Sequence, residues 1–152
     1  MAVEDDLQSM GYTLPAVAKP VASYVPAVRT GNLVFVSGQV PTESGLLKWH
    51  GQVGADLSED DAYNAARTAA LNALAALKSV AGNLDSVRRI VRVTGYVSSD
   101  PGFTNQSVVV DGASDFLVKL FGDKGQHSRV AIGVAALPLD APVEIELVAE
   151  VG

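Results

Sequence analysis

Three charged side chains near the C-terminus have the chemistry to bind an anionic group and to move a proton. Arg129 follows a polar turn, and its guanidinium can hold a carboxylate through two parallel hydrogen bonds. Glu144 and Glu146 are two residues apart in an extended segment, so they share a strand face, where one could activate a water. The residues alone leave alternatives open. Arg129 could pair on the surface with Asp123 or Asp140, and the glutamates could form a solvated acidic face.

Three further residues could contribute to a site. Tyr24 could lie over a planar ligand or donate a hydrogen bond, or it could be a half-buried strand tyrosine. Gly38 ends an extended run, where a missing Cβ allows close approach of a ligand or marks a β-bulge. His127 could act as a base near neutral pH, although its place in a polar turn favours an exposed histidine.

The sequence lacks the residues that several common types of catalytic and binding site require. The chain has no cysteine and two histidines, which excludes disulfides and thiolate chemistry and argues against a metal site built from several histidines. Ser37 and Ser128 have no visible His–Asp relay, so a serine hydrolase triad is not indicated. The sequence also lacks a Walker or dinucleotide-binding glycine motif.

The 152-residue chain has the composition of one folded domain. Hydrophobic residues make up 48% and charged residues 18%, which allows a core and argues against disorder. The net charge of −6 argues against general binding to nucleic acid or anionic membranes, and the dense basic cluster is limited to Arg88, Arg89 and Arg92. The chain does not begin with a signal-peptide pattern, and no apolar run reaches about 18 residues, so we expect a cytoplasmic protein.

Hydropathy and capping patterns predict the element order β-β-α-β-α-β-β. Ser58 is a good N-cap for a helix that ends at Gly82, and Gly31-Asn32 is a hairpin connector. Within 105–121 the Val108-Val109-Val110 run favours a strand, but apolar residues at helical spacing make a helix the better interpretation. The expected strands are 23–29, 33–40, 90–97, 129–135 and 143–150.

The remaining segments complete a two-layer α+β prediction, with two long helices on a largely antiparallel sheet. Residues 1–14 are expected to form an N-terminal arm with a short turn over 5–10, and 15–152 to form a single domain. Residues 41–57 are expected to be a glycine-rich loop, in which Trp49 packs the loop onto the surface.

An ordered set of segments links these elements to a known family. The segments are Tyr24 before a hairpin, Gly31-Asn32, Ser37-Gly38-Gln39-Val40-Pro41, Arg129, Leu137-Pro138 and Val143-Glu144-Ile145-Glu146. Over roughly residues 15–150 the sequence resembles the reactive-intermediate deaminase family (Rid or YjgF), often labelled endoribonuclease L-PSP or translation initiation inhibitor. The longer N-terminus and the segment Asp111-Gly112-Ala113-Ser114-Asp115 resemble a divergent branch of this family.

This resemblance implies a chorismate-mutase-like fold and a homotrimer with sites in clefts between subunits. It implies hydrolysis of 2-imino and 2-enamino acids to 2-keto acids and ammonia, without a metal or an organic cofactor. Two alternatives stay open: a trimer that binds small carboxylates without turnover, and an endoribonuclease or translation inhibitor, which the acidic charge opposes.

The resemblance also assigns roles to residues. It implies that Arg129 holds the substrate carboxylate with help from the Gly38 amide, that Glu144 activates water, and that Tyr24 shapes the pocket. Two positions depart from the family pattern: Asp111 is the best match to a family asparagine, and Ala131 replaces a frequent cysteine. A carboxylate at position 111 would repel an anionic substrate unless it is paired, so the departures concern the substrate more than the reaction.

Overall fold

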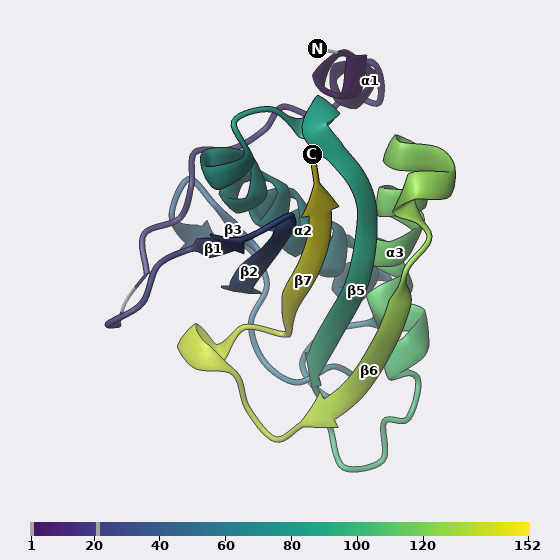
Figure 1. Cartoon of the computed structure of the whole chain (residues 1–152). Coiled ribbons are helices and arrows are strands. Elements are labelled where there is room, and N and C mark those ends of the chain that lie inside the picture. Colours follow the sequence, from purple (N-terminus) through teal and green to yellow (C-terminus); the bar gives the residue numbers. More distant parts are fainter. Residues whose placement is uncertain (1, 21) are drawn as a thin grey trace.

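The computed structural model describes residues 2–20 and 22–152 as a layer of helices packed on a sheet (Figure 1). Met1 of the expected arm and Val21 lie outside the described residues. Helices α2 (Glu59–Ala81) and α3 (Gln106–Phe121) cover the same face of a five-stranded sheet. Its order is β1-β2-β7-β5-β6, formed by β1 (Ala27–Thr30), β2 (Leu33–Gln39), β7 (Val143–Val151), β5 (Val87–Ser98) and β6 (Ser128–Val134).

The neighbouring strands of this sheet are antiparallel except β5 and β6. These two are parallel because α3 returns the chain to the end of the sheet at which β5 began. The α+β class, the mostly antiparallel sheet and the two long helices on one face are therefore confirmed.

Helix α2 begins and ends where its sequence predicts. The Ser58 hydroxyl accepts a hydrogen bond from the Asp61 amide at 3.1 Å. Three acidic residues lie in the first turn, where their negative charges interact favourably with the positive end of the helix dipole. Gly82 ends the helix at a φ of 83°, which favours glycine, and its amide donates to the Lys78 carbonyl. The small side chains of the buried stripe let α2 lie close to β2 and β7; they are Ala62, Ala65, Ala66, Ala69, Ala70 and Ala73.

Helix α3 forms despite its run of three valines. Val109 and Val110 are buried together with Phe116, Leu117 and Leu120, so packing of one helical face outweighs the strand preference of valine. This confirms the helical interpretation of 105–121.

The contact between α2 and α3 depends on Gly112. A Cβ at this position would collide with the Tyr63 carbonyl, which is rigid backbone. We expect Gly112→Ala to lower the free energy of unfolding by about 1–3 kcal/mol, measured by urea denaturation. The matched control is Gly102→Ala, whose Cβ would meet only the Asp100 carboxylate at 3.9 Å. Equal stability of the two variants would contradict this prediction.

Two expectations about the first 57 residues need correction. The short helical turn expected over 5–10 is part of a longer helix that begins earlier, α1 (Ala2–Ser9), with Leu7 buried in the core. The expected loop 41–57 contains a small hairpin of β3 (Thr42–Glu43) and β4 (Leu46–Leu47), which are too short to show an alternating pattern. Trp49 packs partly buried against the core, as predicted.

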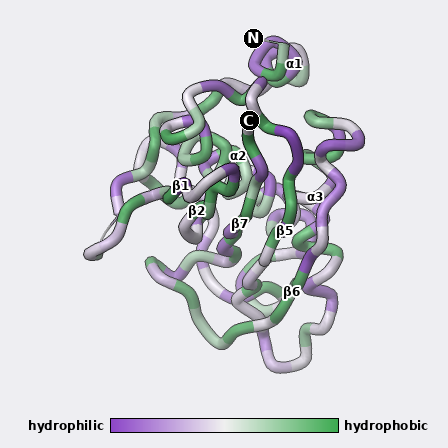
Figure 2. The backbone as a smooth tube through the Cα atoms, in the orientation of Figure 1, coloured by the Kyte–Doolittle hydropathy of each residue, from purple (hydrophilic) through white to green (hydrophobic). Residues whose placement is uncertain are grey.

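In the part of the chain that the structure describes, helices cover only one face of the sheet and leave the second face open. Hydrophobic and hydrophilic residues alternate along β7 (Figure 2), and its odd-numbered residues are buried toward the helices while Glu144 and Glu146 project from the other face. Exposed apolar side chains share that open face, among them Phe35 on β2 and Ile132 on β6. Among the described residues, no helix has the length and apolar character needed to cross a membrane.

Candidate functional site

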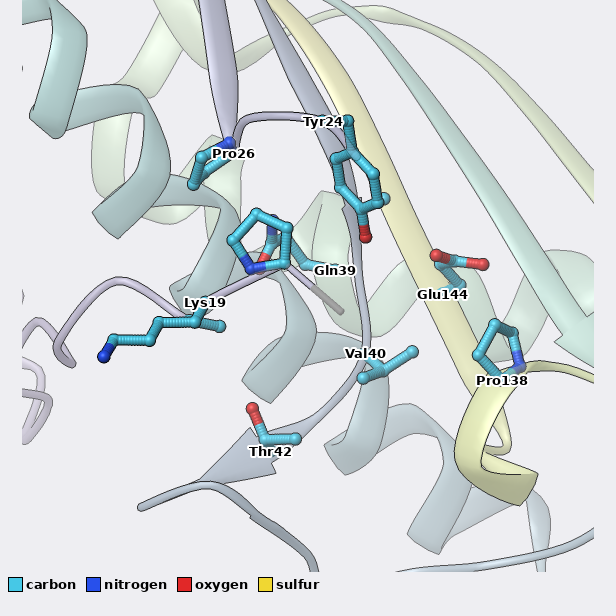
Figure 3. Close-up of a pocket in the computed structure, with 11 residues that line it drawn as sticks. Lys19, Tyr24, Pro26, Gln39, Val40, Thr42, Pro138 and Glu144 are labelled. Atoms are coloured by element: carbon cyan, nitrogen blue, oxygen red, sulfur yellow. The ribbon is translucent and has the colours of Figure 1, made fainter. Parts of the chain in front are cut away.

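A pocket of about 130 Å³ lies where the segment before β1 crosses the ends of β2 and β7 (Figure 3). The Tyr24 hydroxyl and the Glu144 carboxylate project into the same space, while the Lys19 ammonium points away from it. The hydrogen bond from the Ser37 hydroxyl to the Val25 carbonyl, at 2.7 Å, ties the Tyr24 segment to β2. The lining residues are Ala18, Lys19, Pro20, Tyr24, Pro26, Gly38, Gln39, Val40, Thr42, Pro138 and Glu144.

Gly38 makes room for the carboxylate in this pocket. The pairing of β2 with β7 is interrupted between Val36 and Gln39, so Gly38 lies in a β-bulge, as one of its two interpretations predicted. A Cβ at Gly38 would collide with the Oε2 atom of Glu144. The bulge and the missing side chain together allow Glu144 to lie over the end of β2.

The environment of Glu144 favours its protonated form. Burial raises the pKa of this carboxyl above its ordinary value, and the negative charge of Glu146 raises it further. Glu146 itself accepts a hydrogen bond of 2.6 Å from the Tyr96 hydroxyl, which raises the pKa of Tyr96 to about 12. The alternative of a solvated acidic face does not hold for Glu146, because this side chain is half-buried and hydrogen-bonded.

Arg129 lies at the start of β6, where α3 supplies three acceptors for its guanidinium. One terminal nitrogen donates to Asp111 at 2.7 Å and to the Ser114 hydroxyl at 3.2 Å, and the other donates to the Ser107 carbonyl at 3.2 Å. The ion partner is thus Asp111, so the alternative pairing of Arg129 with Asp123 or Asp140 is wrong. The spacing of the two α3 side chains, Asp111 and Ser114, places them on the same helix face.

Ser114 and His127 belong to the same cluster, although neither was predicted to contact Arg129. The Nδ1 atom of His127 lies 2.6 Å from the Gly125 carbonyl, and its Nε2 atom lies 2.9 Å from the Ser114 hydroxyl. A carbonyl only accepts, so Nδ1 carries the proton, and in the neutral ring Nε2 accepts from Ser114. His127 is partly buried, so the expectation of a solvent-exposed histidine is wrong. The signal in the sequence that could have indicated this cluster is the i, i+3 spacing of Asp111 and Ser114, which places both side chains on one helix face.

The structure therefore brings the expected site residues together as two separate groups. Tyr24, Gly38 and Glu144 form the pocket, whereas Arg129 and Asp111 meet beside α3, with Ala131 two residues further along the same side of β6.

These two groups lie on different faces of the sheet. Arg129 points toward α3, and Glu144 projects from the open face. Strand β5 separates them, with Arg129 opposite Val93 and Glu144 opposite Tyr96, which places the two Cα atoms about 14 Å apart. One copy of the chain does not bring Arg129 to the Glu144 pocket.

The fold and motifs match a family model described as "YjgF/chorismate_mutase-like, putative endoribonuclease" over residues 4–151. The chain belongs to the YjgF family. Among the described residues, the YjgF chain has no cluster of three or more His, Cys, Asp or Glu side chains suited to hold a metal ion.

Similar sequences and solved structures agree with the assignment to the YjgF family. The YjgF chain is 41% identical over 149 residues to Protein TCP17 of Trypanosoma cruzi, covering 97% of this chain and 93% of that protein. It is 27% identical over 131 residues to a RutC family protein of Pyrococcus horikoshii, covering 86% and 89%. A crystal structure titled as a putative endoribonuclease from Shewanella oneidensis has a TM-score of 0.95 at 36% identity, covering 98% of this chain and 99% of that one. The 27% identity to the RutC family protein fits a divergent YjgF branch.

Proposed function

We propose that this YjgF family member hydrolyses reactive 2-imino and 2-enamino acids to 2-keto acids and ammonia in the cytoplasm. The observation that carries the proposal is the Glu144 carboxyl, half-buried beneath Tyr24 with its pKa raised by burial and by Glu146. A general base works best when its pKa approaches the working pH, because it then stays ionised and binds a proton strongly.

In the proposed reaction, Glu144 removes a proton from a water whose oxygen attacks the imine carbon. The electron pair of the C=N bond moves to nitrogen, which takes the proton back from Glu144, so that a carbinolamine forms and Glu144 is ionised again. Glu144 then transfers the hydroxyl proton to nitrogen while the C–N bond breaks and the carbonyl forms. One water enters and one ammonia leaves, and a single carboxylate carries the protons in both steps.

Arg129 is proposed to hold the substrate carboxylate, which requires a second copy of the chain. Because Arg129 and Glu144 of one chain lie on different faces of the sheet, the site is complete only where Arg129 of one subunit reaches the pocket of the next. We therefore propose a homotrimer with its sites between subunits, which also follows the family resemblance. Burial of the open sheet face would supply apolar contact area from Val28, Leu33, Phe35, Val130 and Ile132.

The deciding experiment generates 2-iminobutyrate and other imino acids in situ with an amino-acid oxidase. Loss of the imine is followed by semicarbazide trapping, with and without the protein. Faster loss across aliphatic imines would support the proposed hydrolysis. Binding of 2-ketobutyrate without any acceleration would instead favour a carboxylate-binding trimer. No acceleration and no binding would overturn the proposal.

Asp111 is expected to limit the affinity for carboxylates. Its charge neutralises Arg129 at 2.7 Å, so an incoming carboxylate competes with it. Asp111→Asn keeps an oxygen acceptor for the guanidinium but removes the charge, and we expect it to lower KM for 2-iminobutyrate about 3–10-fold with kcat nearly unchanged. Asp115→Asn, one position beyond the Arg129 contacts on the same helix, is the matched control. An unchanged or higher KM in Asp111→Asn would contradict this role.

A further inference from the structure

Two carboxylates lie side by side on the open face of β7. Glu144 and Glu146 occupy alternate positions of the strand, so their Cα atoms are about 7 Å apart. Two negative charges at this spacing repel each other, and the repulsion is strongest where water is partly excluded. Once one of the two groups is ionised, the other therefore holds its proton more strongly, and the surroundings decide which group that is.

Tyr96 distinguishes between the two groups. Its backbone is paired with Glu144 across the sheet, but its hydroxyl reaches past Glu144 and donates to Oε1 of Glu146 at 2.6 Å. A hydrogen bond from a hydroxyl stabilises a carboxylate in its charged form. Among the described residues, the structure gives Glu144 no such donor, while burial and the Glu146 charge raise its pKa.

Other charged groups near the pair do not reverse this difference. Arg92 lines the same shallow hollow as Glu146, so a positive charge faces Glu146 and not Glu144 there. On the Glu144 side, the pocket contains the Tyr24 hydroxyl and the stem of Lys19, whose ammonium points away (Figure 3). The two carboxylates therefore have different surroundings, a hydroxyl donor and a cation at Glu146 and burial at Glu144, as is typical of paired carboxylates with different roles.

We propose that Glu146 and Tyr96 are positioning residues: Tyr96 holds Glu146 as the charged member of the pair, and that charge makes Glu144 the group that accepts the proton of water. The role in catalysis rests on the proposed imine hydrolysis. The coupling between the two carboxylates is a property of the folded protein and can be measured without substrate.

The test is a carboxyl-carbon NMR titration of the ¹³C-glutamate-labelled full chain. The Glu144 resonance is identified by its loss in Glu144→Gln. In Glu146→Gln, we expect the Glu144 titration midpoint to fall by about one pH unit, and the acid limb of kcat/KM for 2-iminobutyrate to fall by a similar amount. In Tyr96→Phe, which keeps the ring and loses the donor to Glu146, the Glu144 midpoint should move in the same direction as in Glu146→Gln, by a smaller amount.

The matched control is Glu150→Gln, which removes the same charge from the same strand face about 20 Å from Glu144. It should leave the Glu144 midpoint within about 0.2 pH units of wild type, because charges at this distance are largely screened. A Glu144 midpoint that does not move in Glu146→Gln would overturn the inference. A wild-type protein that is inactive on every imine would overturn the proposed reaction, while a shifted midpoint would still support the coupling.

Discussion

Replacement of Arg129 by alanine is expected to lower kcat/KM for 2-iminobutyrate at least about a hundredfold. A guanidinium that grips a carboxylate through two charge-assisted hydrogen bonds contributes several kcal/mol in a partly dry cleft. The fold should tolerate the change, because Arg129 lies on the edge strand β6 and the Asp111 left behind is 45% exposed. The measurement is imine loss by semicarbazide trapping, with a thermal melt to confirm folding.

Two further variants separate the geometry of Arg129 from its charge. Arg129→Lys keeps the positive charge but not the planar fork, so its kcat/KM should lie between wild type and Arg129→Ala. Arg89→Ala removes an exposed guanidinium from β5 and should leave kcat/KM within twofold, roughly the scatter of such assays. An alanine variant that keeps more than about a tenth of wild-type kcat/KM would show that Arg129 does not hold the carboxylate.

Glu144→Gln is expected to lower kcat by about 10²- to 10⁴-fold, because glutamine fills the same space but cannot accept the proton. The wild-type pH profile should match this role. Only ionised Glu144 can act as a base, so kcat/KM should rise with pH through a midpoint above the ordinary value for glutamate. A variant with wild-type kcat at all pH values would exclude Glu144 as the base.

The same substitution should change the dependence of stability on pH. Burial raises the pKa of Glu144 in the folded state, so the folded protein binds a proton more strongly than the unfolded chain. Glu144 therefore lowers the free energy of unfolding as the pH rises from its pKa in the unfolded chain through its higher pKa in the folded protein. In urea denaturation, Glu144→Gln should lose that decrease and be at least as stable as wild type at pH 7.

Mixing the two inactive variants tests whether their sites are shared between chains. If Arg129 of one subunit completes the Glu144 pocket of another, co-refolded Arg129→Ala and Glu144→Gln chains should recover about a quarter of wild-type activity, because random assembly pairs an intact Arg129 with an intact Glu144 in that fraction of sites. Sites contained within one chain would stay inactive in every mixture.

The sequence was most informative where local chemistry determines structure. The Ser58 cap and Gly82 define the ends of α2, and strict alternation marks β7. Residues 105–121 were ambiguous, because the choice between strand and helix depends on burial against β5 and α2, which local preference does not contain. The hairpin of β3 and β4 was missed, since two-residue strands have no period to detect.

The sequence and its family resemblance supplied candidate residues but not their arrangement. Order along the chain located Tyr24, Gly38, Glu144 and Arg129, yet it could not show that Arg129 and Glu144 project from different faces of the sheet. That relation depends on the register of β5 with both of its neighbours, which pairs Val93 with Arg129 and Tyr96 with Glu144. The contacts of Ser114 depend on the docking of α3 against β6, which no local pattern encodes.

The placement of the two residue groups has a consequence for how this protein can diversify. Asp111, Ala131 and Ser114 surround Arg129 on the helix side of the sheet, and the Glu144 pocket lies on the other side. In the proposed reaction, substitutions around Arg129 would therefore change which anionic end groups are accepted without moving the Glu144 carboxylate of the same chain. Under that proposal, the residues that select the substrate and the residue that activates water belong to different parts of each chain, so one set could change in evolution while the other is kept.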